Sequence, residues 1–389
     1  MFFIFSLLIV CVACGKKKSD NGTGSNSSLS IADVQQERDN SATTTFHFIV
    51  NVNNVSSKEI TVNYTTVNGT ADTSYYVPNS GTLTIPANQA SAGIDVVVKG
   101  DSLREASKTF YVQLSNPVNA STPGYAKGTG TILCDGTYLP VNDSGYTAPT
   151  SYPGMTLKWS DEFNGNAVNT NNWNYDTGSS GWGNNELENY TNSTKNSFVT
   201  KGGYLVLEAR QEALGSNNYT SARMLTMGKQ EYTYGRIDVR AILPKGQGIW
   251  PAIWMLGSDI NTTPWPACGE IDMMELLGNQ PAKVYGTMHW SNSSGQDANV
   301  GGNYTLPAGD FSQEFHVFSV VWDSTKIAWY VDNQLYFTGD QSDVTTVNPF
   351  NKPFFFILNI AVGGNWPGNP DGTTVFPQRM IVDYVRVYQ

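Results

Sequence analysis

Histidine and cysteine are scarce in this sequence of 389 residues, which has three histidines and four cysteines. The histidines are far apart, and so are the cysteines outside the first fourteen residues, so the ligand spacing of a zinc site is missing. Basic residues are also few, with 23 Lys and Arg against 33 Asp and Glu, which gives a net charge of −10. Because nucleic-acid binding needs a basic surface, this balance argues against a nucleic-acid partner.

Apolar runs long enough to span a membrane are missing too. The apolar stretch at 1–13 is shorter than the roughly 20 residues that a transmembrane helix needs. Ala13 followed by Cys14 resembles the cleavage end of a bacterial lipoprotein signal. We therefore predict a lipoprotein-type signal peptide over 1–14, a lipid on Cys14 and a flexible Ser-, Asn- and Gly-rich tether over 15–28. The protein would be an exported, membrane-anchored lipoprotein at the cell surface or in the periplasm; plain secretion is the alternative.

Residues 29–134 show no helical periodicity. Segments such as 45–50 alternate apolar and polar side chains, which is the pattern of half-buried strands. Turn dipeptides such as Asn68-Gly69 separate these segments, so we predict a small β-sandwich. The Gly-Thr-Ala motif at 69–71 resembles part of a Calx-β domain. Domains of that kind can bind calcium; the alternative is a spacer that holds the following domain away from the membrane.

Residues 135–152 are rich in Gly, Pro, Asn, Asp and Thr and are predicted to form a linker. A second domain is expected over 153–389, where the composition changes, because all ten tryptophans lie between Trp159 and Trp366. Sugar rings have flat apolar faces that pack on aromatic rings, so this enrichment favours a carbohydrate-binding cleft. Packing in a core is the alternative use of the same side chains.

One short segment concentrates acidic residues among apolar ones. Its three acids are Glu270, Asp272 and Glu275. On a regular strand Glu270 and Asp272 share one face and Glu275 points to the other. One extra residue, a β-bulge between Asp272 and Glu275, would place all three on one face and leave Ile271 and a methionine on the buried face. An acidic strand facing water, or a calcium site, is the alternative.

Two carboxylates held side by side can cleave a glycosidic bond, and their separation decides the stereochemistry. Roughly 5–5.5 Å gives retention of configuration, and about 6.5–9.5 Å gives inversion. Glu270 and Glu275 would be four ladder steps apart, ~13 Å between Cα atoms at ~3.3 Å each. The strand would therefore have to curve toward the substrate for both side chains to act on one bond.

The segment from Glu270 to Glu275 matches the E-x-D-x-x-E signature of glycoside hydrolase family 16 in its laminarinase-like form. The resemblance extends over 153–389. It implies an all-β chain, with a concanavalin-like β-jelly roll of two curved antiparallel sheets after the smaller β-sandwich. It also implies that Glu270 is the nucleophile, that Glu275 is the general acid and base, and that Asp272 shares a hydrogen bond with Glu270. Neighbouring negative charge should raise the pKa of Glu275.

Other segments resemble parts of the same family that contact the sugar. The segment 181–190 is similar to its G-W-G-N-N-E-L-x-x-Y loop, and two tryptophans four apart on a predicted strand would point to the same side. The residues implied to bind substrate are Asn184, Glu186, Arg223, Trp250, Trp254, His289, Asn359 and Trp366. Turns, surface ion pairs and core packing are the alternative uses of these residue types. The resemblance also implies a structural calcium ion held by Glu162, the carbonyl of Gly203 and Asp383.

The activity implied is that of a retaining endo-glycosidase acting on β-1,3-glucan (laminarin) or mixed β-1,3/1,4-glucan, as a monomer and without a catalytic cofactor. Hydrolases of agar, carrageenan or porphyran share the expected fold and acids, and a transglycosylase uses the same residues. A non-catalytic glucan-binding surface protein is an alternative of a different class. Loss of Glu270 or Glu275 would mark such a protein, and both are present.

Overall fold

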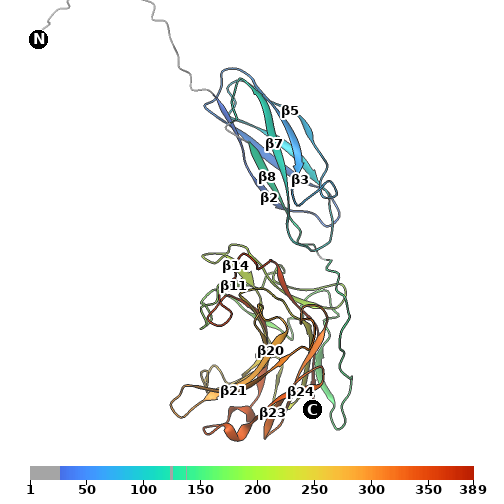
Figure 1. The fold of residues 1–389 in the computed structure, drawn as a ribbon, viewed down its shortest axis with the longest axis vertical. Helices are drawn as coiled ribbons and strands as arrows, with labels where there is room; N and C mark the ends of the chain where they lie inside the picture. The colour runs from blue at the N-terminus through green and yellow to red at the C-terminus, as the bar shows by residue number, and fades with distance from the viewer. Residues whose placement is uncertain (1–26, 123–125, 137) are drawn as a thin grey trace, which may run out of the picture. The chain divides into compact units, whose positions relative to one another are not determined.

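The computed structural model describes residues 27–122, 126–136 and 138–389. Nearly all of its regular structure is β-strand, which confirms the all-β prediction (Figure 1). The predicted signal peptide, the lipidation site Cys14 and nearly all of the predicted tether lie outside the described residues. Within the described part of the chain, no helix is both long and apolar enough to cross a membrane.

The chain divides into two compact units. The first contains most of the chain up to Leu133, and the second contains 134–389 together with the short segments 38–41 and 101–106. The two short segments therefore pack with the second unit although they lie within the sequence of the first.

The first unit is a β-sandwich of a three-stranded and a five-stranded sheet, in the orders β1-β3-β6 and β2-β8-β7-β4-β5. Its strands are β1 (Ser28–Ile31), β2 (Val34–Glu37), β3 (Thr44–Asn53), β4 (Ile60–Asn68), β5 (Ser80–Ile85), β6 (Ser91–Val98), β7 (Lys108–Val118) and β8 (Lys127–Leu133). Phe46 and Phe48 of β3 are fully buried and contact the ring of Phe110 on β7. The alternation predicted over 45–50 therefore directs one face of β3 into the core between the sheets.

The second unit contains two eight-stranded antiparallel sheets. The sheet that holds β19, called the β19 sheet, has the order β10-β15-β25-β18-β19-β20-β21, and β16 also pairs with β25. The other, called the β22 sheet, has the order β12-β13-β26-β17-β22-β23-β24, and β9 also pairs with β26. A separate parallel pair is formed by β11 and β14.

The bounds of these elements are β9 (Leu157–Asp161), β10 (Asn174–Asp176), β11 (Glu188–Tyr190), β12 (Ser197–Val199), β13 (Leu205–Ala209), β14 (Tyr219–Ser221), β15 (Arg223–Leu225), β16 (Glu231–Tyr232), β17 (Gly235–Ile242), β18 (Ile249–Gly257), β19 (Glu270–Leu276), β20 (Lys283–Ser291), β21 (Asp297–Thr305), β22 (His316–Trp322), β23 (Lys326–Val331), β24 (Gln334–Asp340), β25 (Phe354–Val362) and β26 (Gln378–Tyr388). Two short 3-10 helices, η1 (Gln341–Asp343) and η2 (Pro349–Asn351), precede β25.

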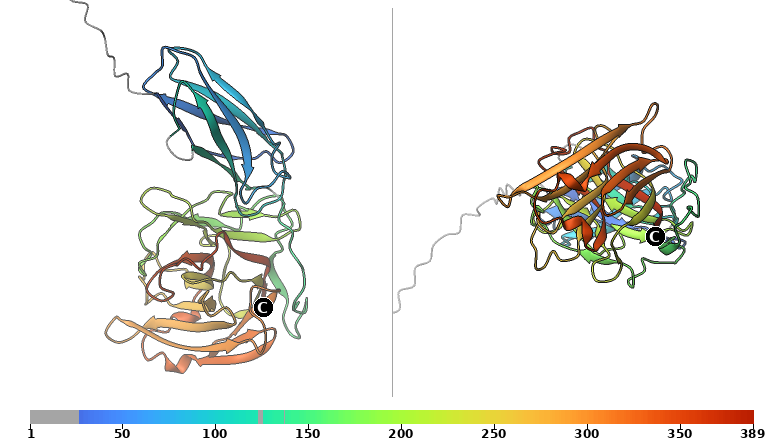
Figure 2. Two further views of the ribbon diagram at one scale, coloured as in Figure 1. Left: turned by 45° about the horizontal axis from the view of Figure 1, so that its top comes forward. Right: turned by 90° about the horizontal axis from the view of Figure 1, so that it is seen from below.

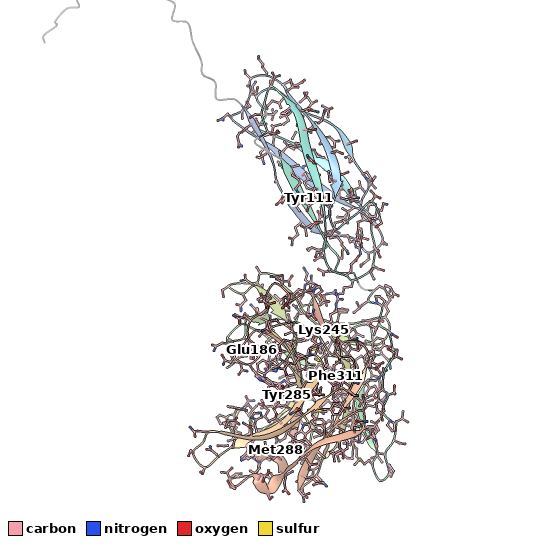
Figure 3. All side chains as sticks on the ribbon, in the orientation of Figure 1. Tyr111, Glu186, Lys245, Tyr285, Met288 and Phe311 are labelled. Atoms are coloured by element: carbon pink, nitrogen blue, oxygen red, sulfur yellow. The ribbon has the colours of Figure 1, made fainter. Side chains whose placement is uncertain are left out.

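The core of the second unit lies between its two large sheets. Ile271 and Met288 from the β19 sheet and Val320 and Trp329 from the β22 sheet belong to one buried cluster (Met288 is labelled in Figure 3). Figure 1 labels β20 and β21 of one layer and β23 and β24 of the other, and Figure 2 shows the same strands from two further directions. The jelly-roll prediction for this unit is confirmed.

The strands around residue 332 form a three-stranded meander. Asp332 and Asn333 have φ of 49° and 63° and connect β23 to β24. Two adjacent residues with positive φ are what a tight hairpin turn requires. The strand β22 also pairs with β23 and completes the meander.

Candidate active site

The strand β19 carries the three predicted catalytic acids and is bulged as predicted. Against β18, Ile253 pairs with Met274 and Trp254 pairs with Asp272, so the register shifts by one residue. The pairing with β20 shifts between Asp272 and Glu275. The extra residue brings Glu270, Asp272 and Glu275 to one cleft, while the residues between them are buried in the core.

A tryptophan of the β22 sheet supports the bulge from behind. A bulge takes backbone groups out of the strand ladder, and a buried carbonyl then needs another donor. The fully buried indole of Trp329 donates a hydrogen bond from Nε1 to the carbonyl of Asp272, at 2.8 Å. Gly286 of β20 lies opposite the bulge, and a Cβ there would be 2.4 Å from Cδ1 of Trp329. Glycine at this position leaves the space that the indole occupies.

A cleft of about 740 Å³ lies over the β19 sheet. The three predicted catalytic acids line it, as do all of the predicted substrate-binding residues, Asn184, Glu186, Arg223, Trp250, Trp254, His289, Asn359 and Trp366. Other lining residues were not anticipated from the sequence, among them Trp182, Trp265, Thr287, Asp297 and Asn299. Residues from separate segments of the chain thus meet at one surface, and the part that each plays there stays a prediction.

Glu275 lies close to two other acids in the cleft, where a further negative charge is unfavourable. Burial and then the negative charges of Asp272 and Glu270 raise its pKa well above the ordinary value. The expected effect of neighbouring charge is present, although burial is the larger cause. The indole Nε1 of Trp250 donates a hydrogen bond to Oε1 of Glu275 at 3.0 Å, which acts in the opposite direction. Glu275 therefore keeps its proton above the pH at which an exposed carboxyl loses it.

Glu270 and Asp272 form a coupled pair beside it. Burial and the charge of Asp272 raise the pKa of Glu270 to about 8, while His289 and a hydrogen bond from Trp265 oppose that rise. Burial also raises the pKa of Asp272, and its interaction with Glu270 lowers it. The predicted hydrogen bond between the two acids stays a prediction. Both acids lose their protons above the pH at which an exposed carboxyl would.

His289 on β20 is held between two groups of carboxylates. Its Nδ1 donates to the carboxylate of Asp297, with Oδ1 at 3.0 Å. Its Nε2 lies 3.1 Å from Oδ2 of Asp272 and 3.9 Å from Oε1 of Glu270. Within the described part of the chain, one oxygen each from Glu270 and Asp272 and a ring nitrogen of His289 make the group that could hold a metal ion.

Asn359, one of the residues implied to bind substrate, is a polar residue within the buried strand β25, and it has the partners that such a residue requires. Its Oδ1 accepts a hydrogen bond from Nε1 of Trp254 at 2.8 Å, and its Nδ2 donates to the hydroxyl of Tyr190 at 3.1 Å. Tyr190 in turn donates to Oε2 of Glu186 at 3.2 Å. These bonds connect the floor of the cleft to the 181–190 loop, of which Glu186 is labelled in Figure 3.

Arg223 lies close to two aromatic rings of the cleft lining. Its guanidinium carbon lies 4.9 Å from the ring centre of Trp182 and 4.8 Å from that of Trp254. Its Nε donates to Asp176 at 2.9 Å. The ion pair that the sequence left as an alternative is therefore present, but within the cleft. The stacked guanidinium fixes Trp254 as a flat wall.

Glu188 is a buried acid that sequence reasoning did not single out. It has no exposed surface, its Oε2 accepts from the backbone nitrogen of Val362 at 2.7 Å, and its Oε1 has no hydrogen-bond partner. Burial and the charge of Glu186 raise its pKa to about 9. The only sequence signal was its position two residues after Glu186, which places both on one side of an extended chain.

The residues predicted to hold calcium are engaged by arginines. Oε1 and Oε2 of Glu162 accept from Arg386, each at 2.8 Å, and Oδ2 of Asp383 accepts from Arg240 at 2.8 Å. Burial alone would raise the pKa of Glu162, but Arg386 outweighs it and holds that pKa below the usual range. Gly203 adopts a φ of 80° in a turn after β12. An ion here would have to compete with both guanidinium groups, and the calcium site stays a prediction.

Comparison with known proteins identifies both units. The model of "Glycosyl hydrolases family 16" matches residues 184–386, and that of the "Calx-beta domain" matches residues 27–133. A beta-glucanase of Rhodothermus marinus is 41% identical over 250 residues, which cover 61% of this chain and 86% of that protein. The glucan endo-1,3-beta-glucosidase A1 of Niallia circulans is 41% identical over 261 residues, but this chain spans only 38% of its length.

A solved structure extends the likeness to three dimensions. The laminarinase catalytic domain from Thermotoga maritima MSB8 is 48% identical to this chain, with a TM-score of 0.56. The match covers 60% of this chain and 98% of the laminarinase domain. With the matching family model, the bulged acidic strand and the aromatic cleft, this shows that the chain is a member of glycosyl hydrolases family 16, with a Calx-beta domain before the catalytic domain.

Proposed function

We propose that the protein is a retaining endo-glycosidase that hydrolyses β-1,3-glucan or mixed β-1,3/1,4-glucan. The observation that carries the proposal is the bulge in β19, which gathers Glu270, Asp272 and Glu275 at one cleft between aromatic side chains. The relatives named a beta-glucanase, a glucan endo-1,3-beta-glucosidase and a laminarinase support the choice of β-glucan. The cleft of about 740 Å³ is lined by several tryptophans, among them Trp182 and Trp366, on which successive sugar rings of a polysaccharide could pack.

In the first step, an oxygen of the Glu270 carboxylate attacks the anomeric carbon of the bound sugar. Glu275 gives its proton to the glycosidic oxygen as the bond to the leaving chain breaks. In the second step, Glu275 takes a proton from water, which attacks the same carbon and releases Glu270. Two displacements at one carbon restore the original configuration, so the product keeps the β-anomer.

The electrostatics support this division of roles. Burial and the negative charges of Asp272 and Glu270 raise the pKa of Glu275 well above its ordinary value, which suits a group that must hold a proton before it donates it. Asp272 lies beside Glu270, and a hydrogen bond between the two acids would tune the nucleophile. Trp250 donates to Glu275 and would stabilise the carboxylate that remains after proton transfer.

Other parts of the proposal concern the remainder of the chain. We propose that a lipid on Cys14 anchors the protein outside the cytoplasm, that the Calx-beta domain acts as a spacer, and that the protein is a monomer. A structural calcium ion at Glu162, Gly203 and Asp383 belongs to the same set of proposals. Radiolabelled palmitate incorporation that is lost in a Cys14→Ala variant would support the anchor.

A reducing-sugar assay on laminarin, lichenan and agarose tests the function directly. Release of oligosaccharides from laminarin, from lichenan or from both supports the proposal. Release from agarose alone would favour a galactan hydrolase, and release of longer chains with added acceptor sugar would favour transglycosylation. Binding of laminarin without any product would favour a glucan-binding protein. Proton NMR of fresh product checks the stereochemistry, because appearance of the α-anomer first would contradict retention.

A further inference from the structure

Polar side-chain atoms of His289, Asp272 and Glu270 lie close together in the cleft. Asp272 is only 3% exposed, and no hydrogen-bond donor is aligned with its Oδ2. Nε2 of His289 lies 3.1 Å from this oxygen. Nδ1 of His289 is hydrogen-bonded to Asp297, so the ring is held with Nε2 toward Asp272. A cation placed here would meet the buried oxygen of Asp272 and a ring nitrogen together.

The distances fit a small metal ion. Zinc binds histidine nitrogen and carboxylate oxygen at about 2.0–2.2 Å, so neighbouring ligands of a tetrahedral site are about 3.3–3.5 Å apart. Nε2 of His289 is 3.1 Å from Oδ2 of Asp272 and 3.9 Å from Oε1 of Glu270, which brackets that separation. The oxygens and the nitrogen lie within 4.8 Å of one another. The fourth position of such a site would open to the cleft.

The surroundings of His289 resemble the second layer of a metal site. Histidines that bind metals usually donate their other ring nitrogen to a carboxylate, which fixes the ring and makes the ligating nitrogen more basic. Asp297 supplies that carboxylate, and Nδ2 of Asn299 holds Asp297 with a hydrogen bond to Oδ2 at 2.9 Å. Both residues lie on β21, so the support comes from a strand that carries none of the three ligands.

We propose that Glu270, Asp272 and His289 bind a first-row divalent transition ion such as Zn²⁺, and that the ion inhibits the enzyme by occupying its nucleophile. A metal-bound oxygen of Glu270 has no free lone pair directed at the anomeric carbon, and the ion fills the space that the sugar must enter. The nitrogen ligand and the three-ligand geometry favour Zn²⁺ over Mg²⁺ and Ca²⁺, which prefer oxygen ligands in larger number. The inhibition rests on the proposed function; the binding does not.

The test is calorimetric titration of the purified protein with Zn²⁺ in a buffer that does not chelate metals. We expect one Zn²⁺ per chain at this site, with no comparable binding of Mg²⁺. His289→Gln should weaken the binding at least tenfold. Asp297→Asn keeps all three ligands and should weaken it by about 10–100-fold, the usual effect of removing such a supporting group. Circular dichroism and thermal melting would establish that both variants are folded.

The matched control is His47→Gln, which removes an exposed histidine that also pairs with an aspartate, Asp95, at 2.5 Å. This change should leave Zn²⁺ binding at the cleft unaltered. A laminarin oligosaccharide should compete with the ion, and Zn²⁺ should raise the apparent KM more than it lowers kcat.

Two results would overturn the proposal: no binding at millimolar Zn²⁺, or binding that His289→Gln leaves intact and the oligosaccharide does not displace. A chain that binds Zn²⁺ through His289 but cleaves no glucan would contradict the proposed function and leave the metal site standing.

Discussion

The indole nitrogen of Trp329, in the β22 sheet, donates a hydrogen bond to the backbone carbonyl of Asp272, in the β19 sheet, at 2.8 Å. The bond connects a buried core residue to the start of the bulge in β19. It replaces a ladder partner that the bulge removes. The positions of the acids therefore depend on a side chain that lies behind them and does not touch the substrate.

Trp329→Phe keeps an aromatic ring but leaves the carbonyl of Asp272 without its donor. A buried unsatisfied carbonyl costs about 1–3 kcal/mol, and each kcal/mol lowers the melting temperature by about 2–4 °C for a domain of this size. We expect a lower melting temperature together with a several-fold lower kcat, because the acids lose their alignment. Calorimetry and a reducing-sugar assay measure the two effects. An unchanged kcat in a destabilised variant would show that the bulge holds its shape without this bond.

Trp250→Phe removes the hydrogen bond to Glu275 and keeps a flat ring in the cleft. Because that bond lowers the pKa of Glu275, its loss raises the pKa further, and the alkaline limb of the pH–rate profile should move to higher pH. Hydrogen bonds to charged groups contribute about 1.5–3 kcal/mol, so kcat should fall by roughly 10–100-fold. A profile that moves to lower pH would contradict the assignment of Glu275 as the acid.

Glu270→Gln removes the nucleophile with almost no change in shape. Turnover should fall by roughly 10⁴-fold or more, while binding of laminarin oligosaccharides changes by less than about tenfold. Initial rates and calorimetric titration give the two quantities. The control is Glu314→Gln, at an exposed glutamate away from the lining of the cleft, which should alter neither. Residual activity near that of the native protein would exclude Glu270 as the attacking group.

Glu188→Gln tests how a buried acid makes stability depend on pH. The pKa of Glu188 is raised to about 9 in the folded protein, whereas an unfolded glutamate has a pKa of about 4.3. The unfolded chain therefore loses this proton first. The stability associated with Glu188 is fully present below about pH 4.3 and is lost as the pH rises toward 9.

Glutamine is neutral at every pH and can still accept from Val362 and donate toward Glu186. The melting temperature of Glu188→Gln relative to the native protein should therefore rise between pH 5 and pH 9, by several degrees. Thermal melts at intervals of one pH unit would show this, with Glu314→Gln again as a control without a trend. A flat difference across the range would mean that Glu188 is ionised in the folded state.

Much of the fold and of the cleft could be predicted from local pattern. Period-two alternation predicted strands such as β3, and the spacing of Glu270, Asp272 and Glu275 predicted the bulge, because only an added residue brings the third acid to the same face. Asn359, expected from the resemblance to bind substrate, lines the cleft. Each of these features could be predicted because it depends on residues that are close together in the sequence.

What escaped prediction depends on contacts between distant segments. Asp297 has no distinguishing pattern in its own sequence, and its importance comes from the pairing of β21 with β20, which brings it to His289. Trp329 lies in a hairpin strand with ordinary apolar neighbours, and nothing local indicates that its indole reaches Asp272. The arginines that engage Glu162 and Asp383 likewise come from β26 and β17, so the choice between a metal ion and an ion pair could not be made from the acids alone.

Because of the bulge in β19, the number of residues between two acids does not by itself determine how far apart they lie. Glu275 lies five positions after Glu270 in the sequence. The residues of β18 that face them, Leu256 and Ala252, are only four positions apart. A protein with one residue fewer between its two glutamates, and an ordinary flat ladder, would present the same pair to a substrate. Pattern searches that fix the interval between the acids would therefore treat two equivalent catalytic surfaces as unrelated.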